Sequence, residues 1–189
     1  MSRSIIFAAC AAIFTTWTGI PAAAQNPVQI ATFQSWHTFI MSDRSSCGAR
    51  ARADISTHAA RASAVLTVIS TPAQNITNNI IYQAGYTFGT PSYLTLQVEG
   101  GLYALPIPRR TTLGIFTDSN IVELLRKGSQ VVFRGPAVDG PIDASATFYL
   151  AGFSEALDRA MRECGLLPPA ATSSIVPSMG GCRREVGRN

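Results

Sequence analysis

The sequence contains few of the residues from which metal sites and catalytic centres are built. Its 189 residues include only two histidines, His37 and His58, and four cysteines. No Cys-x-x-Cys or His-x-x-x-His spacing occurs, so nothing specific predicts a zinc site. Gly85-Tyr86 and Gly100-Gly101 are predicted turns that lack the following helix of a phosphate-binding loop. We therefore predict no metal and no cofactor.

Charge is also sparse, because only 14% of the residues are charged and the formal net charge is +4. Removal of a leader that contains Arg3 lowers this charge to +3. Much of the remainder lies near the C-terminus, where Arg183, Arg184 and Arg188 outweigh Glu185. The rest of the chain is then close to neutral, and a nucleic-acid partner, which requires a concentrated basic surface, is not predicted.

Residues 1–24 have the three regions of a signal peptide. Arg3 gives a positive start, residues 5–20 are mostly apolar, and residues 21–24 (PAAA) supply the small side chains that a signal peptidase needs. We predict cleavage after Ala24 and a periplasmic or extracellular location. One alternative is an uncleaved membrane anchor, for which the apolar run is short. Another is a lipoprotein modified at Cys10, which too little apolar sequence precedes.

Export determines how the other cysteines are interpreted, since thiols pair in an oxidising compartment. Cleavage leaves Cys47, Cys164 and Cys182, an odd number. Cys47 and Cys164 both lie at the edges of predicted regular elements, and we predict a disulfide between them. Cys182 lies among Pro, Ser and Gly residues, and it is either free or paired between molecules.

Short segments of alternating apolar and polar residues, separated by turn signals, predict an all-β fold. In 47–54, small apolar residues alternate with Arg50 and Arg52, which predicts one buried face and one basic, solvated face. The clearest hairpin signal joins 93–99 to 102–107 through Gly100-Gly101. The other predicted strands are 32–41, 64–69, 79–88, 113–116, 130–134 and 142–150, and the segments 25–31 and 55–61 are predicted as irregular connections.

Two short segments have helical periodicity instead, 120–127 and 153–164. The predicted N-caps are Asp118 or Ser119 for the first helix and Ser154 for the second, and the predicted terminal glycines are Gly128 and Gly165. Strands in this number, with only two short helices, favour one antiparallel β-sandwich domain over residues 25–165. A flexible, basic tail rich in Pro, Ser and Gly is predicted for residues 166–189.

Several of these features together resemble one known family. They are a first strand with Trp36, Cys47 soon after it, residues 85–88 (GYTF) at a corner, and above all residues 148–157 (FYLAGFSEAL). This layout resembles the invasion-associated locus B family of alphaproteobacterial exported proteins, over about residues 32–164. The resemblance implies an immunoglobulin-like β-sandwich, and the family's name refers to bacterial entry into host cells. It implies no catalytic residues, and the additional cysteines of the longer family pattern are missing here.

The sequence is compatible with three functions. The first is an exported, non-enzymatic binding module in the periplasm or at the cell surface, with an envelope or host-surface protein as partner. Its candidate anion-facing surface is the Arg50 and Arg52 face, which also suits contact with a membrane surface, although a solvated strand face needs no partner. The second is a thiol enzyme using Cys47 with His37 or His58. The third is an accessory subunit attached to a membrane complex through its leader or tail. We favour the first.

Overall fold

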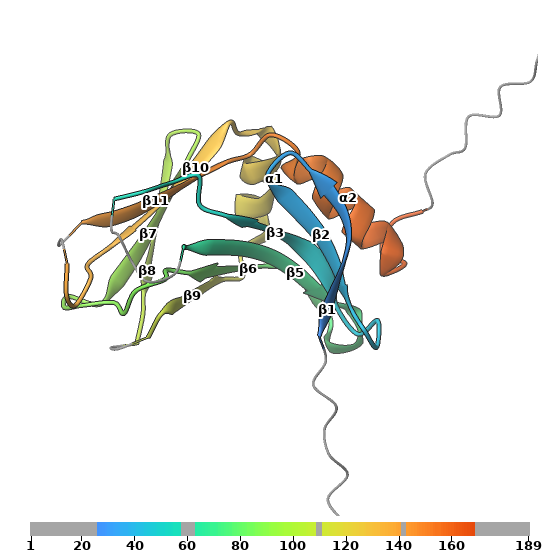
Figure 1. Cartoon of the computed structure of the whole chain (residues 1–189), viewed down its shortest axis with the longest axis horizontal. Coiled ribbons are helices and arrows are strands. Elements are labelled where there is room, and N and C mark those ends of the chain that lie inside the picture. The colour runs from blue at the N-terminus through green and yellow to red at the C-terminus, as the bar shows by residue number, and fades with distance from the viewer. Residues whose placement is uncertain (1–25, 58–62, 109–110, 141–142, 169–189) are drawn as a thin grey trace, which may run out of the picture.

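Two antiparallel sheets packed face to face form the body of the protein (Figure 1). The structure is a computed structural model that describes residues 26–57, 63–108, 111–140 and 143–168. The predicted leader, His58 and Cys182 lie outside these residues, as does nearly all of the predicted tail. The all-β sandwich with two short helices is confirmed.

The first sheet has six strands, and its order nearly follows the chain. In spatial order these strands are β1 (Pro27–Phe33), β2 (Trp36–Met41), β3 (Cys47–Arg52), β5 (Val65–Thr71), β6 (Ile76–Gln83) and β9 (Leu113–Phe116). The second sheet has five strands, in the order β4 (Ile55–Ser56), β11 (Ala144–Tyr149), β10 (Gln130–Gly135), β7 (Tyr93–Val98) and β8 (Gly101–Pro106). A 3-10 turn, η1 (Pro72–Gln74), separates β5 from β6.

Aromatic rings fill the space between the two sheets. Tyr82 of β6 stacks on Phe133 of β10 with ring centroids 4.2 Å apart, and Phe148 of β11 meets Phe133 edge-on at 5.9 Å. All three side chains are fully buried. Such rings remove large apolar areas from water and gain further stability from their mutual geometry. The alternation predicted for 142–150 is confirmed for its described residues, because Ala144, Ala146 and Phe148 face the interior.

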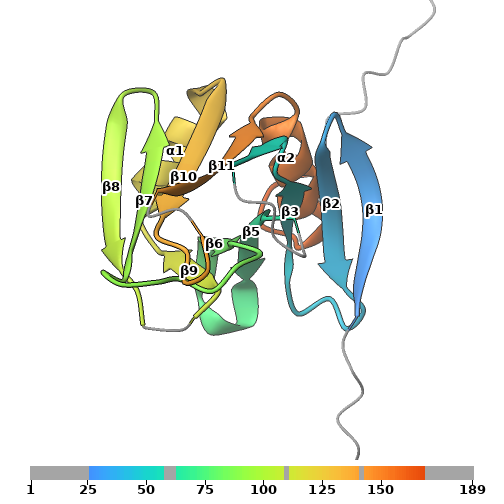
Figure 2. The same ribbon diagram turned by 60° about the vertical axis from the view of Figure 1, so that its left-hand side comes forward.

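The second helix, α2 (Phe153–Glu163), covers the part of the six-stranded sheet formed by β1, β2 and β3 (Figures 1 and 2). Phe153 packs on Trp36 with ring centroids 4.7 Å apart, and the Thr38 hydroxyl donates to the Ala156 carbonyl at 3.0 Å. The apolar face predicted for this helix is buried, as the spacing of its residues requires. The other helix, α1 (Ser119–Lys127), begins at the predicted N-cap Asp118 and contacts β6.

Gly152 sets the angle at which β11 passes into α2. Its φ is 84°, and a Cβ there would collide with the carbonyl group of Phe33 at the turn between β1 and β2. Only glycine combines this backbone conformation with so close an approach. The prediction of Ser154 as N-cap was therefore wrong: Gly152 occupies the cap, and the Ser154 hydroxyl donates to the Arg126 carbonyl.

Three other predictions were wrong in their boundaries. Residues 25–31 were predicted as irregular, yet β1 lies there and pairs with β2 through a tight turn in which Gln34 takes a positive φ of 55°. The predicted Gly100-Gly101 turn lies one residue earlier, since Glu99 and Gly100 both have positive φ and Gly101 already pairs with Val98. Residues 55–61 likewise contain the two-residue strand β4. The missed turn and the displaced turn each contain a non-glycine residue in left-handed backbone, Gln34 and Glu99.

Candidate functional site

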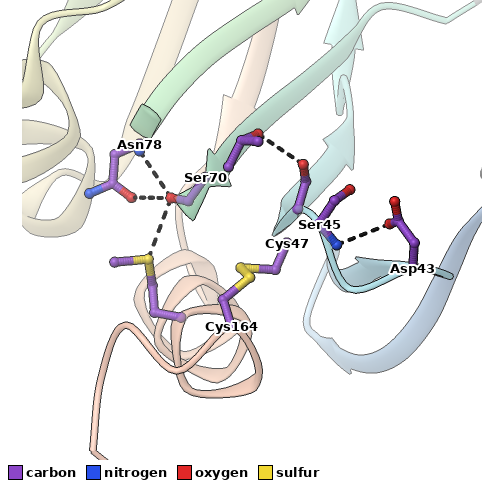
Figure 3. The surroundings of a disulfide bond; sticks show 9 residues. Asp43, Ser45, Cys47, Ser70, Asn78 and Cys164 are labelled. Carbon is purple, nitrogen blue, oxygen red and sulfur yellow. Dashed lines mark hydrogen bonds between the residues drawn. A yellow bond between two sulfur atoms is a disulfide. The ribbon is translucent and has the colours of Figure 1, made fainter. Parts of the chain in front are cut away.

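The predicted disulfide between Cys47 and Cys164 is present, with a Cα–Cα distance of 6.1 Å (Figure 3). It joins the first residue of β3 to the residue that ends α2, and the two cysteines are 117 positions apart. In the chain-entropy account, closing a loop of this length stabilises the folded state by about 4–5 kcal/mol. The disulfide therefore fixes α2 against the six-stranded sheet.

Polar contacts near the disulfide involve β5, β6, α2 and the turn between β2 and β3 (Figure 3). The hydroxyl of buried Ser70 accepts from the Asn78 amide at 3.0 Å and lies 3.6 Å from the Met161 sulfur of α2. Asp43 accepts from the Ser45 amide at 3.0 Å, and this hydrogen bond lowers the pKa of the Asp43 carboxyl. Each of these groups serves the packing of the helix or the turn between β2 and β3.

The arrangement that a thiol enzyme would need is not assembled among the described residues. Cys47 is 1% exposed, its sulfur is oxidised, and it shares the interior face of β3 with Ala49 and Ala51. His37 pairs in register with Arg50, on the opposite face of the sheet. A nucleophile and its base must lie within hydrogen-bond distance of each other. The sheet itself separates these two.

Aspartates serve separate structural purposes. Asp118 caps α1, Asp54 accepts from the Tyr149 amide at 2.8 Å, and Asp143 contacts Arg134 at 3.4 Å. Within the described ranges, no group of three or more His, Cys, Asp or Glu residues could hold a metal ion. No helix among the described residues is long and apolar enough to cross a membrane.

The two buried tyrosines, Tyr82 and Tyr86, stay protonated near neutral pH. Burial raises the pKa of Tyr86 to about 12, and burial also raises the pKa of Tyr82. The Tyr86 hydroxyl donates to the Gly135 carbonyl at 3.2 Å. Most of the other aromatic side chains of the described residues are also buried in the core.

A cationic hollow lies on the outer face of the six-stranded sheet, over β1, β2, β3 and β5. Its volume is about 250 Å³. The residues that line it are Gln29, His37, Arg50, Ala51, Arg52 and Val65. The candidate residues Arg50 and Arg52 are thus brought together with His37, which sequence analysis had considered only as a partner of Cys47. We call this group the arginine hollow.

Alternation along β3 places both arginines on the outer face. Arg50 and Arg52 are two residues apart in a strand, so their Cα atoms are about 7 Å apart. His37 is the register partner of Arg50 on β2. Its Nδ1 lies 3.1 Å from the Thr32 hydroxyl, which leaves Nε2 as the ring nitrogen that can meet a ligand. Arg50, Arg52 and His37 therefore surround one concave surface, together with the amide side chain of Gln29.

The Arg50 side chain is held in place by an aromatic ring. Its guanidinium carbon lies 5.8 Å from the centroid of Phe39, within the range of a cation–π contact. Phe39 is only 4% exposed, because its ring lies beside its register partner Gly48. A Cβ at Gly48 would stand 3.0 Å from Phe39 Cζ and inside the contact distance of the Val68 carbonyl oxygen. Gly48 is therefore required for this arrangement.

Neither arginine of the hollow forms an ion pair with a carboxylate of the described residues. The ion pairs found there belong to Arg126, Arg134 and Arg159. Two larger hollows, of about 420 and 710 Å³, also contain arginine, but Glu99 lines the first and Glu163 the second. Positive charge without a lining carboxylate thus distinguishes the arginine hollow from both.

Comparison with known proteins supports the fold. No family model matches the chain, and no curated protein is significantly similar in sequence. Among solved structures, invasion associated protein B from Bartonella henselae is similar, with a TM-score of 0.50 and 16% identity. The match covers 70% of this chain and 95% of that one. The chain has a fold like that of invasion associated protein B, as the resemblance at residues 148–157 led us to expect.

Proposed function

We propose that this chain is an exported, non-enzymatic binding module of the invasion-associated locus B type, and that it binds anionic groups in the arginine hollow. The observation that carries the proposal is the convergence of Arg50, Arg52 and His37 on one hollow that no described carboxylate lines. Guanidinium groups bind phosphate and carboxylate oxygens with paired N–H donors. Since Arg50 is already oriented by Phe39, less side-chain entropy is lost when it binds.

Export and the absence of catalysis belong to the same proposal. Residues 1–24 are the basis for export, and a disulfide between Cys47 and Cys164 is what an oxidising compartment favours. The thiol enzyme has less support, because Cys47 is oxidised and lies on the face opposite His37. Intact mass of the protein isolated from its cells tests the leader: loss of residues 1–24 is expected, and retention would favour an accessory subunit held at a membrane.

Binding can be measured by titrating the purified protein with inorganic phosphate at constant ionic strength, followed by amide NMR. We expect saturable shifts at the amides around Arg50 and Arg52, and loss of saturation in the double variant Arg50→Ala/Arg52→Ala. The matched control is Arg159→Ala/Arg162→Ala, which removes two charges from the hollow that contains Glu163. Shifts that do not saturate, or that persist in the Arg50→Ala/Arg52→Ala variant, would refute the anion site.

A further inference from the structure

The outer face of the six-stranded sheet changes from basic to apolar along one line of register partners. This line crosses the sheet from β1 to β9, and its residues are Thr32, His37, Arg50, Thr67, Ile81 and Ile115. Register partners lie side by side on one face of a sheet. The arginine hollow and the isoleucines therefore belong to a single surface.

The apolar end of this surface lies on an edge strand. Leu113 and Ile115 of β9 are 43% and 49% exposed, whereas Gly114 and Phe116 between and after them face the interior. Ile81, the partner of Ile115 on β6, lies on the same outer face. Proteins usually protect an edge strand with charged residues, and β9 (LGIF) has none. Exposed apolar side chains grouped in this way mark a contact surface.

Charge on this sheet has one sign only. None of its six strands contains Asp or Glu, and Arg50 and Arg52 are its only Lys or Arg residues. The carboxylates nearest to these strands along the chain are Asp43, Asp54 and Asp118, which lie in connections and accept backbone N–H groups. The strands of this sheet therefore combine positive charge and apolar side chains without opposing charge.

The spacing suits the surface of a lipid bilayer. Three strand steps separate β3 from β9, or about 14 Å. An anionic bilayer presents phosphate groups and apolar chains together across its interface, and basic residues near it are attracted by its surface potential. Apolar side chains that enter the interface add binding energy in proportion to the area they bury.

We propose that this outer face docks on an anionic lipid surface, with Arg50 and Arg52 on lipid phosphates and with Leu113 and Ile115 entering the interface. This inference rests on the proposed function, because the phosphate groups are bound at the arginine hollow. It commits to a lipid partner because charge and apolar area lie on one open face, whereas the hollow alone suits any small anion.

Sedimentation with vesicles tests the docking. One set contains phosphatidylcholine alone, and the other contains equal parts of phosphatidylcholine and phosphatidylglycerol. We expect binding to the anionic set only, weakened by added salt. Arg50→Ala/Arg52→Ala should weaken that binding about 30-fold, from about 1 kcal/mol per basic residue at the surface. Leu113→Ser/Ile115→Ser should weaken it about tenfold and leave the phosphate titration unchanged.

The phosphate titration and the vesicle sedimentation together distinguish failure of lipid docking from failure of the proposed function. Phosphate binding without vesicle binding would refute lipid docking and leave the anion site, as would vesicle binding that Leu113→Ser/Ile115→Ser does not weaken. If the partner is an acidic protein instead, the chain should likewise bind phosphate and fail to bind vesicles. Loss of both kinds of binding would refute both proposals. Equal binding to the two vesicle sets would also refute the docking, and Arg159→Ala/Arg162→Ala should behave like the unchanged protein.

Discussion

The two faces of β3 are made differently, although they alternate residue by residue. Cys47, Ala49 and Ala51 face the interior, where they are closed by a disulfide and covered by α2. Arg50 and Arg52 face outward and have no ion-pair partner among the described residues. Small side chains on the inner face allow a helix to lie close to the sheet. The outer face carries long cationic side chains. Among the described residues, none of their contacts is as strong as the disulfide and the helix packing on the inner face.

Because of this contrast, stability and the proposed anion binding can be tested separately along a single strand. Substitutions on the inner side should lower the free energy of unfolding, because they remove packing or covalent closure. Substitutions of outer residues should leave that free energy nearly unchanged and alter binding instead. Variants on the two sides of β3 and of its sheet should therefore differ in which of the two quantities they change.

The largest effect is expected in the interior, for Phe133→Ala. Phe133 is fully buried and stacks on Tyr82, so its removal leaves a cavity between the sheets. We expect the free energy of unfolding to fall by about 4 kcal/mol, measured by urea denaturation. The outer-face control, Ile115→Ala, should change it by less than about 0.5 kcal/mol. Similar losses in the two variants would contradict the division between the faces.

Loss of the disulfide should come next. Cys47→Ala/Cys164→Ala removes closure of a long loop without leaving an unpaired thiol. It should cost about 2–4 kcal/mol, the usual contribution of a disulfide, which is below the chain-entropy value for a loop of this length. The helix α2 should loosen first, which hydrogen exchange at the Ala156 and Ala160 amides can detect as lost protection relative to β10. Uniform loss of protection across both sheets would show that the disulfide does not act on the helix in particular.

Sequence patterns predicted what depends on residues near one another in the chain. The alternation at 47–54 gave the inner and outer faces of β3, and the change of period after Gly152 gave α2. The Cys47–Cys164 disulfide followed from the predicted export and from the positions of the cysteines at element edges. In each case, the signal lies within short stretches of sequence and does not depend on which strands pair.

The side chains that strand pairing brings together could not be predicted from the sequence. His37 and Arg50 are partners because β2 pairs with β3, and Ile115 joins the same line through β5 and β6. No single segment contains this line, so the arginine hollow was anticipated only as two arginines on a strand. The strand β1 was missed for a different reason, since Gln34 gives no glycine or asparagine signal at its turn.

Gly48 is the exception on the outer face, because it has a structural task. In Gly48→Ala the added methyl group would collide with the Val68 carbonyl and displace the Phe39 ring on which Arg50 lies. We expect a loss of about 1–3 kcal/mol from this overpacking, together with weaker phosphate binding. Gly101→Ala on β8 is the control, with a milder contact to Tyr103. Unchanged stability in Gly48→Ala would mean that the strand relaxes around the new group.

The smallest effect on stability is expected for the arginines themselves. Arg52→Ala should change the free energy of unfolding by less than about 0.5 kcal/mol, and Arg50→Ala by about 0.5–1 kcal/mol, since it loses a cation–π contact with Phe39. Urea denaturation with an unchanged m-value would confirm that only small surface terms are lost. A loss near 3 kcal/mol would instead assign the arginines to the packing of the sheet. Their weakened binding could then not be separated from unfolding, and the outer face would no longer differ from the inner one.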